Sequence, residues 1–254
     1  MKIISWNING FRAVLRKNAL NQILDWSPDL LCLQEIKAKP EQIPDNERDL
    51  PGYFAFWNPA ERPGYSGVLT YAKVNPDSIT YGIQHENSDS EGRVIRTDFR
   101  DISIFNIYFP NGQRGQDRLD FKLDFYDHIL TTSKKLQANG KEVIIGGDFN
   151  TAHTDIDLAN PRENEMNSGF LPEERAKIDE YVEAGFVDIF RYKYPTDTRY
   201  TWWTYRFGAR PRNIGWRIDF FMVTGNLIKR IKAVDILDRV EGSDHCPILL
   251  EYMD

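Results

Sequence analysis

The sequence predicts an α/β sandwich, in which two mostly antiparallel β-sheets pack face to face and helices cover the outside. Two observations lead to this fold class. Strand-like runs recur along the whole chain of 254 residues, and most are short, β-branched or aromatic, and bounded by Gly, Pro, Asn or Asp. Helical patterns are few and irregularly spaced, so too few crossovers exist for a doubly wound parallel sheet. We expect a single domain over residues 1–254.

Ten strands are expected, at residues 2–8, 30–34, 53–57, 67–72, 93–99, 102–108, 142–145, 217–223, 231–236 and 247–252. Arg100 and Asp101 separate two of these runs and are typical of a tight hairpin turn.

Three helices are expected between the strands. Apolar residues recur at three- and four-residue spacing over residues 118–137, and an Asn-Gly pair follows this pattern. Pro172 begins a second helix, acidic residues occupy its first turn, and Gly185 ends it. A third helix covers residues 13–26 and stops before Pro28.

Composition excludes several classes of protein. With 41% hydrophobic and 28% charged residues, the chain is typical of a folded soluble protein. No apolar stretch is long enough to span a bilayer, and the first residues resemble a strand rather than a signal peptide. We therefore expect a cytoplasmic protein with no membrane partner, associated with the nucleoid if it binds DNA. Cys32 and Cys246 are the only cysteines, which predicts no disulfide framework. A monomer is expected, because no amphipathic dimerisation helix is evident.

The net charge of −6 argues mildly against a nucleic-acid-binding protein, but the charge is unevenly distributed. Residues 198–218 hold no acid before Asp219 and contain five arginines: Arg199, Arg206, Arg210, Arg212 and Arg217. The same window holds six aromatic residues: Tyr200, Trp202, Trp203, Tyr205, Phe207 and Trp216. Such a basic, aromatic segment indicates a local face for a polyanion. The alternative is a long loop whose aromatic residues cap the core.

The Gly-Gly-Asp-Phe-Asn segment at residues 146–150 follows a buried apolar run. The glycines permit a tight turn or a close approach to a ligand. Asp148 and Asn150 point to the same side if the chain stays extended. A carboxylate that takes a proton or holds a cation, beside an amide that donates to an anion, suits activation of water next to a phosphate.

Polar residues stand at the ends of six predicted strands: Asn7, Glu35, Tyr108, Asp148, Asp219 and the pair Asp244-His245. Packed sheets would bring several of them to one rim, where open α/β structures tend to place their sites. Simpler interpretations remain for some of them, with Asn7 in a turn, Glu35 as a cap beside Lys37 or Lys39, and Tyr108 in the core. Asp219 needs a partner, because its strand neighbours are apolar.

The oxygen-rich set of strand-end residues suits Mg²⁺, which prefers few protein ligands and keeps several waters. Zinc is not expected, because the chain has no cysteine cluster and no closely spaced histidine pair.

Seven short blocks of sequence resemble one known family. They are Ser-Trp-Asn-Ile-Asn-Gly-Phe-Arg-Ala at 5–13, Leu-Gln-Glu-Ile-Lys at 33–37, Gly-Tyr-Ser-Gly-Val at 64–68, Tyr-Phe-Pro-Asn-Gly at 108–112, Gly-Asp-Phe-Asn at 147–150, Gly-Trp-Arg-Ile-Asp at 215–219 and Gly-Ser-Asp-His-Cys-Pro at 242–247. In this order, and across essentially the whole chain, they resemble the exonuclease III class of abasic-site endonucleases, within the endonuclease/exonuclease/phosphatase superfamily. The Trp-Arg-x-Asp and Tyr-x-Pro-Asn blocks narrow the match to the DNA-repair branch.

The resemblance implies a four-layer α/β sandwich with pseudo-twofold halves. It implies incision of duplex DNA on the 5′ side of abasic sites, often with a 3′-phosphodiesterase or 3′→5′ exonuclease activity on blocked 3′ ends. Related enzymes sometimes also nick at deaminated bases.

The resemblance also implies roles for individual residues. Asp148 would activate the attacking water, Asn150 would orient it, and His245, held by Asp219, would contact the scissile phosphate. Mg²⁺, with Mn²⁺ as a substitute, would bind Glu35. The residues implied at or near the metal are Asn7 and Asp244, with Asp148, Asn150 and His245 as candidates for a second ion. Tyr108 is implied as a further catalytic residue, which with Asn111 would donate hydrogen bonds to the phosphate. The residues implied to contact DNA are Asn111, Lys37, Arg114, Trp202, Arg206 and Trp216.

Two other readings stay open. The superfamily includes lipid and inositol phosphatases and non-specific nucleases with the same Glu, Asp-x-Asn and Asp-His core, although the arginine-aromatic window favours DNA. The second alternative is a DNA-binding relative without catalytic activity. The presence of all the polar residues that the resemblance implies argues against this alternative. Some relatives carry phenylalanine where this chain has Trp202, which leaves the range of lesions open.

Overall fold

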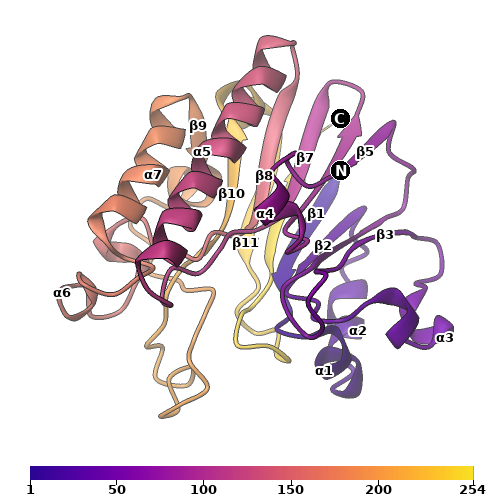
Figure 1. The fold of residues 1–254 in the computed structure, drawn as a ribbon, viewed down its shortest axis with the longest axis horizontal. Coiled ribbons are helices and arrows are strands. Elements are labelled where there is room, and N and C mark those ends of the chain that lie inside the picture. The colour runs from indigo at the N-terminus through magenta and orange to yellow at the C-terminus, as the bar shows by residue number, and fades with distance from the viewer. Residues whose placement is uncertain (254) are drawn as a thin grey trace.

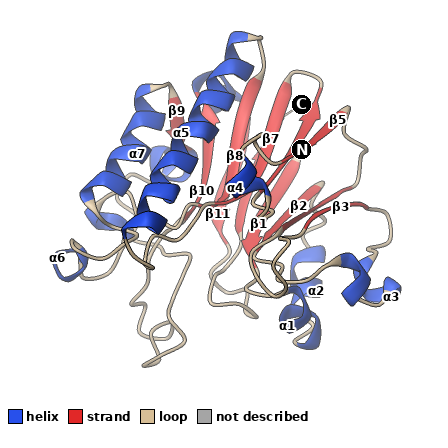
Figure 2. Ribbon diagram, in the orientation of Figure 1, coloured by secondary structure: helices blue, strands red, loops and turns tan. Residues whose placement is uncertain are grey.

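Two six-stranded sheets lie face to face in the computed structural model, which describes residues 1–253 (Figures 1 and 2). The first sheet has the order β11 (Ile231–Ile236), β12 (Ile248–Tyr252), β1 (Lys2–Asn7), β2 (Leu30–Gln34), β4 (Val68–Ala72) and β3 (Phe54–Asn58). The second has the order β5 (Ser78–Tyr81), β6 (Val94–Phe99), β7 (Ile102–Tyr108), β8 (Glu142–Asp148), β10 (Asp219–Thr224) and β9 (Phe186–Asp188).

Both sheets repeat one arrangement of strands. A parallel pair lies at the centre of each, β1–β2 in the first and β7–β8 in the second, and all other neighbours are antiparallel. The predicted sandwich of two mostly antiparallel sheets is therefore confirmed, and its two halves follow the same plan.

Helices cover the two outer faces of the sandwich (Figure 2). On the second sheet lie α5 (Gln116–Ala138) and α7 (Pro172–Glu183), and on the first lie α1 (Phe11–Arg16) and α2 (Ala19–Leu24). The shorter helices are α3 (Asp45–Arg48), α4 (Glu86–Asp89), α6 (Pro161–Asn164) and α8 (Ile189–Lys193). Short 3₁₀ turns cover Pro40–Gln42, Asp155–Asp157 and Gly225–Arg230. No helix within residues 1–253 combines the length and the apolar character needed to cross a membrane.

Side-chain alternation along the strands divides the core into three apolar layers. In β1, Ile3 faces the second sheet while Ile4 faces α1 and α2. In β7, Ile104 faces the first sheet while Phe105 faces α5 and α7. The central strands are therefore buried on both faces, which explains why their sequences are apolar runs rather than alternating patterns.

All ten expected strands are present, but the expectation missed two others. Strands β5 and β9 lie at the two edges of the second sheet, and each has a single neighbouring strand. Both are short, so little apolar surface marks them in the sequence. The helix expected over 13–26 is wrong in one respect, because it breaks into α1 and α2 at Asn18, whose φ of 53° is left-handed.

The glycines before Asp148 serve close packing and not a turn. Strand β8 continues through Gly146 and Gly147 to Asp148. A Cβ atom on Gly147 would lie 1.9 Å from the carbonyl oxygen of Ile107, and one on Gly146 would lie 2.6 Å from the ring of Phe221. Only glycine lets β7, β8 and β10 approach so closely next to Asp148.

A buried ion cluster anchors the strand that carries Asp219. The guanidinium of Arg217 donates to Asp157 at 2.8 Å and to Asp188 at 2.7 Å, and all three side chains are less than a tenth exposed. Burial alone would raise the pKa of Asp157, but Arg217 and Arg191 outweigh it and lower that pKa to about 2. The ionised carboxylate therefore stabilises the folded state.

This cluster predicts a loss of stability in acid. Because the pKa of Asp157 falls from an ordinary 3.8 to about 2 on folding, its contribution of about 2 kcal/mol is complete above pH 4 and is lost as the pH falls toward 2. In urea unfolding, the stability difference between wild type and Asp157→Asn should shrink by about 1 kcal/mol between about pH 6 and about pH 3. A difference independent of pH would contradict this assignment.

Candidate active site

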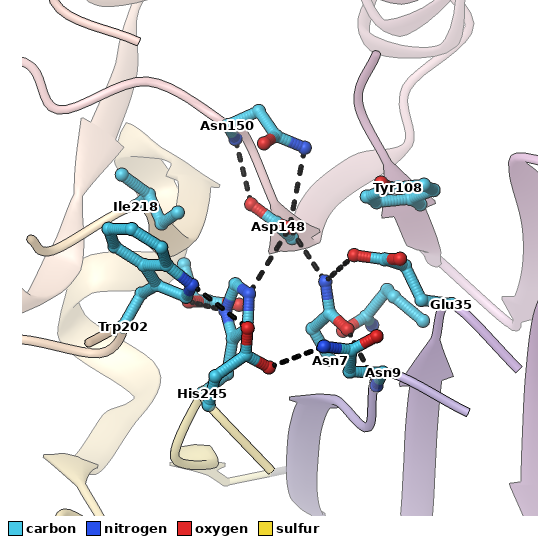
Figure 3. A network of polar contacts seen from close by, with 12 residues as sticks. Asn7, Asn9, Glu35, Tyr108, Asp148, Asn150, Trp202, Ile218 and His245 are labelled. Carbon is cyan, nitrogen blue, oxygen red and sulfur yellow. Dashed lines mark hydrogen bonds and ion pairs between the residues drawn. The ribbon is translucent and has the colours of Figure 1, made fainter. Parts of the chain in front are cut away.

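A cavity of about 930 Å³ opens at the rim where the central strands of both sheets end. The parallel pairs β1–β2 and β7–β8 finish here, and β10 starts here. Residues lining the cavity include Glu35, Tyr108, Asn111, Asn150, Trp202, Trp216, Asp244 and His245. The fold thus brings the predicted strand-end residues together, and Figure 3 labels Asn7, Glu35, Tyr108, Asp148 and His245 among them.

Asp148 is the centre of the polar network in Figure 3. Its Oδ2 accepts from Asn7 Nδ2 at 2.8 Å and lies 3.9 Å from Nε2 of His245. Its Oδ1 accepts the backbone N–H of Asn150 at 2.8 Å. Burial, reinforced by Asp219 and Glu35 and opposed by His245, raises the pKa of Asp148 to about 7. A carboxylate of this kind is suited to taking up a proton near neutral pH.

His245 is paired with Asp219, as the sequence required for a carboxylate in an apolar strand. Nδ1 of His245 lies 2.9 Å from Oδ2 of Asp219. Thr201 holds the start of β10 by accepting the backbone N–H of Asp219 at 3.1 Å. Burial lowers the pKa of His245, but Asp219 and Asp148 outweigh it and raise the pKa to about 10. The ring is therefore an imidazolium at neutral pH, with Nε2 directed at Asp148.

Glu35 and Asn7 form the part of the site that fits a metal ion. Asn7 Nδ2 donates to Glu35 Oε1 at 2.8 Å as well as to Asp148, so one amide joins the two carboxylates. Ligand atoms of Glu35, Asp148 and His245 lie within 4.8 Å of one another. Two carboxylates and an amide are the donors that a hard divalent cation prefers, so these residues fit Mg²⁺.

Lys37 places its ammonium against the same carboxylate. Nζ lies 2.7 Å from Glu35 Oε2 and donates to Asn9 Oδ1 at 2.5 Å. This residue is thus part of the Glu35 network, and its charge competes with any cation that binds there.

Asp244 lies at the cavity but is separated from the closest group of ligand atoms. Its Oδ1 accepts from Asn9 Nδ2 at 3.0 Å, and its Oδ2 accepts from Trp202 Nε1 at 3.1 Å. Burial raises the pKa of Asp244, but His245 and these donors outweigh it and the pKa is lowered. The geometry links Asp244 to Lys37 and Glu35 through Asn9.

Several residues at the site have left-handed backbones: Asn9, Glu35, Lys37 and Asn150, with φ between 45° and 52°. A non-glycine residue in this region costs about 1 kcal/mol or more, and such residues gather at functional sites. The surrounding hydrogen bonds hold this strained arrangement in place.

Tyr108 and Asn111 both line the cavity. The Arg93 guanidinium stacks on the Tyr108 ring at 4.5 Å. Burial, reinforced by Glu35, raises the pKa of Tyr108 well above 10, so its hydroxyl remains a neutral donor. Asn111 Nδ2 donates to Asn150 Oδ1 at 3.2 Å. Asn150 uses its own Nδ2 on Phe109 O and on Asp148, so it orients Asp148 in this arrangement.

The aromatic wall consists of Trp202 and Trp216, which meet edge to face with ring centroids 6.3 Å apart. Gly169 lies behind Trp216, where a Cβ atom would approach the ring to 3.2 Å. Ile218 adds an apolar contact beside them. Trp202, Trp216 and Ile218 thus form an apolar side of a cavity whose lining is otherwise largely polar.

The interpretation of residues 198–218 as one basic face needs correction, because most of its arginines are used inside the protein. Arg199 pairs with Asp235, and Arg210 donates to three backbone carbonyl oxygens. Arg217 is buried in the ion cluster described above. Within this window, Arg206 and Arg212 remain exposed.

Besides Lys37, two predicted DNA contacts lie outside the main cavity. Arg206 is on the exposed loop that follows Trp203, next to exposed Tyr205 and Phe207. Arg114 precedes α5 and lines a separate surface pocket with Arg62 and Arg118. Both are placed to meet a ligand larger than the cavity itself.

Three residues that support the site were not among the sequence-based predictions: Asn9, Arg93 and Lys122. Asn9 joins Asp244 to Lys37, and its position two residues after Asn7 was the available signal. Arg93, which directly precedes β6, supports Tyr108. Lys122 of α5 is fully buried and donates to the carbonyl oxygen of Asn150 at 2.7 Å. A lone lysine at an inward helical position could have drawn attention to it.

Comparison with known proteins identifies the family to which the chain belongs. The chain matches the endonuclease/exonuclease/phosphatase family over residues 4–245. It is 44% identical to an exodeoxyribonuclease of Bacillus subtilis, with 98% of both chains covered, and 41% identical to the DNA repair nuclease APEX1 of Danio rerio, over 98% of this chain and 81% of the relative. It is also similar to the structure of an AP endonuclease from Archaeoglobus fulgidus, with a TM-score of 0.89, 27% identity and full coverage of both chains. These matches confirm the resemblance drawn from the sequence, and the chain belongs to the endonuclease/exonuclease/phosphatase family, within its branch of DNA-repair exodeoxyribonucleases and AP endonucleases.

Proposed function

We propose that this chain is a Mg²⁺-dependent endonuclease that hydrolyses the phosphodiester bond on the 5′ side of an abasic site in duplex DNA. Its products are a 3′-hydroxyl and a 5′-deoxyribose phosphate. The observation that carries the proposal is the position of Asp148, a buried carboxylate 3.9 Å from the His245 imidazole, at a cavity walled by two tryptophans. The names of relatives at 41–44% identity support DNA as the substrate.

The chemistry begins with a water molecule next to Asp148. Because Asn7 and Asn150 both donate to its carboxylate, Asp148 is fixed with a lone pair available for the water proton. Proton removal by a positioned base contributes about 10²–10⁴-fold to a rate. The water oxygen then attacks phosphorus, and the bond between phosphorus and the 3′ oxygen breaks.

Charge that develops on the phosphate is met by donors already in place. The imidazolium of His245 donates from Nε2, since Nδ1 is held by Asp219. The Tyr108 hydroxyl and the Asn111 amide add neutral donors on the other side. When bound at Glu35, with Asn7 and Asp244 near it, Mg²⁺ or Mn²⁺ would neutralise phosphoryl charge and stabilise the leaving 3′ oxygen. Asp148, Asn150 and His245 are the candidates for a second ion.

Selectivity for abasic sites follows from the aromatic wall. A nucleotide without a base leaves the helix at little stacking cost, and its sugar would lie in the cavity against Trp202 and Trp216. Arg114 would enter the duplex, while Lys37 and Arg206 would contact its backbone. Blocked 3′ ends present the same phosphodiester to the same groups, so we include 3′-phosphodiesterase and 3′→5′ exonuclease activity. The enzyme would be a single-domain monomer. It would act in the cytoplasm, on the DNA of the nucleoid.

An incision panel tests this function. Duplexes with one abasic site, one uracil, one 3′-phosphate end or no lesion are incubated with the protein, with and without EDTA. We expect rapid cutting of the abasic duplex in Mg²⁺, slow cutting of the intact duplex, and no cutting in EDTA. Equal cutting of abasic and intact DNA would instead identify a non-specific nuclease. Binding without cutting of any duplex would identify a DNA-binding relative.

A further inference from the structure

A second group of metal-ligand side chains lies on the surface, apart from the cavity. His85, Asp124 and His128 offer ligand atoms that all lie within 4.8 Å of one another. His85 precedes α4, whereas Asp124 and His128 lie one turn apart on α5. None of the three lines the catalytic cavity. Two of the four histidines of the chain therefore meet here only through the fold.

The distance between His85 and Asp124 matches that between two ligands of one ion. His85 Nε2 and Asp124 Oδ2 are 3.4 Å apart. Ligands about 2.0–2.1 Å from a tetrahedral zinc ion lie about 3.3–3.4 Å from each other. The two imidazole rings meet at a centroid distance of 4.6 Å and an angle of 60°. Small side-chain rotations would therefore converge all three groups on one point.

Each imidazole also has an outer partner of the kind that metal ligands require. Nδ1 of His128 lies 2.9 Å from the carbonyl oxygen of Asp124, which can only accept, so Nδ1 carries the hydrogen and Nε2 keeps its lone pair. Nδ1 of His85 lies 3.1 Å from the hydroxyl of Ser88, which can accept its hydrogen in the same way. Metal-bound histidines almost always donate their second ring N–H to such a partner, which fixes the tautomer.

The segment that carries His85 is held in place by its own backbone contacts. Asp89 accepts the N–H groups of Ile83 at 2.8 Å and His85 at 3.1 Å. Gly82 leaves room for the Asp89 carboxylate, which would lie 2.2 Å from a Cβ atom at that position. These contacts fix the backbone at Ile83 and His85, on the side of the loop that faces α5 through His85.

We propose that His85, Asp124 and His128 form a second metal site, for a borderline divalent transition ion such as Zn²⁺. Two imidazoles with one carboxylate select such ions over Mg²⁺, which prefers oxygen ligands. The side chains of Asp124 and His128 are 50% and 42% exposed, so water can complete the coordination. The expectation that zinc is excluded rested on spacing along the chain, which does not reveal this pair.

Such an ion would tie the 82–90 loop to α5. That link would stand beside the ion pair between Glu91 and Arg118, which joins the same two segments at 2.7 Å. Glu91 also holds Arg93, the residue stacked under Tyr108. The site is therefore structural, and it stiffens a segment that supports the catalytic residues without touching them.

Zn²⁺ titration by calorimetry tests the site, using the full chain without a histidine tag and with excess Mg²⁺ present. We expect His128→Ala and His85→Ala to weaken one Zn²⁺-binding event by more than about 100-fold, and Ser88→Ala to weaken it by about tenfold. The matched control is His153→Ala, which removes a surface histidine that pairs with a single carboxylate, Asp179, at 2.8 Å.

Two further measurements separate this site from the catalytic one. Glu35→Gln should leave the Zn²⁺-binding event intact, since it alters only the cavity. Zn²⁺ should raise the Tm of wild type and of His153→Ala, but not that of His85→Ala or the conservative Asp124→Asn. A Zn²⁺ isotherm and Tm response unchanged by His85→Ala and His128→Ala would overturn the proposal.

Discussion

Asp148→Asn is expected to lower the rate of incision at an abasic site by about 10²–10⁴-fold while binding of abasic duplex is retained. Asparagine keeps the shape of the side chain and can still accept from Asn7, but it cannot take a proton from water. Single-turnover incision in Mg²⁺, with binding followed separately by fluorescence anisotropy, measures the two effects. A variant with wild-type turnover would refute the role assigned to Asp148.

Two companion variants make that result specific. His245→Ala should show a similar loss, because it removes the imidazolium that faces the phosphate and leaves Asp219 buried without its partner. Asp98→Asn is the matched control. Asp98 lies on β6, outside the cavity, and its buried carboxylate accepts hydrogen bonds from Ser78 and Ser103. It should affect stability alone and leave the incision rate of the folded protein unchanged.

Glu174→Met is expected to lower the free energy of unfolding by about 3–5 kcal/mol. Glu174 is fully buried in the first turn of α7 and accepts from Lys122 Nζ at 2.7 Å. It also accepts the N–H of Gly169 at 2.5 Å and that of Leu171 at 3.1 Å. Its removal leaves the Lys122 ammonium buried without a counter-charge. Urea unfolding at neutral pH measures the loss.

A double-mutant cycle separates this ion pair from general loss of packing. Lys122→Met/Glu174→Met should be more stable than Glu174→Met, because no unpaired charge then remains. Glu180→Met is the matched control on the same helix: Glu180 pairs with Lys177 at 3.0 Å but is 42% exposed, so its loss should cost less than about 1 kcal/mol. An equal loss of unfolding free energy in Glu174→Met and Glu180→Met would contradict the role given to burial of the ion pair.

The same pair also carries a functional expectation. Lys122 holds the backbone of Asn150, and Glu174 holds Gly169 behind the Trp216 ring. The Lys122–Glu174 pair therefore couples the segment that carries Asn150 to the aromatic wall of Trp202 and Trp216. Incision by Glu174→Met should fall even at temperatures at which the variant is fully folded.

The fold and much of the candidate site follow from the sequence for a common physical reason. Central strands are buried on both faces, so each reads as an apolar run, and a polar residue such as Glu35 or Asp148 at its end stands out. Edge strands β5 and β9 lack that contrast and were missed. The helix break at Asn18 is set by one local backbone angle, which helical periodicity does not report.

The sequence could not show which charged or metal-ligating side chains from distant segments come together. In the sequence, nothing distinguishes Arg217 from the exposed arginines near it. In the structure, its guanidinium pairs with Asp157 and Asp188, which lie 60 and 29 residues away. His85 and His128 are equally unremarkable until α5 and the loop meet. In both cases the information lies in contacts between distant segments, and only the folded chain contains them.

The order of strands has a consequence for folding. The second sheet is built from one continuous stretch, β5 to β10, whereas the first sheet combines β1 to β4 with β11 and β12. Lys2 pairs with Glu251, so the first sheet closes only after nearly the whole chain is available. Long-range closure of this kind is slow relative to local pairing. Since Glu35 and His245 come from the first sheet and Asp148 from the second, hydrolytic competence should be among the last properties that a refolding molecule acquires.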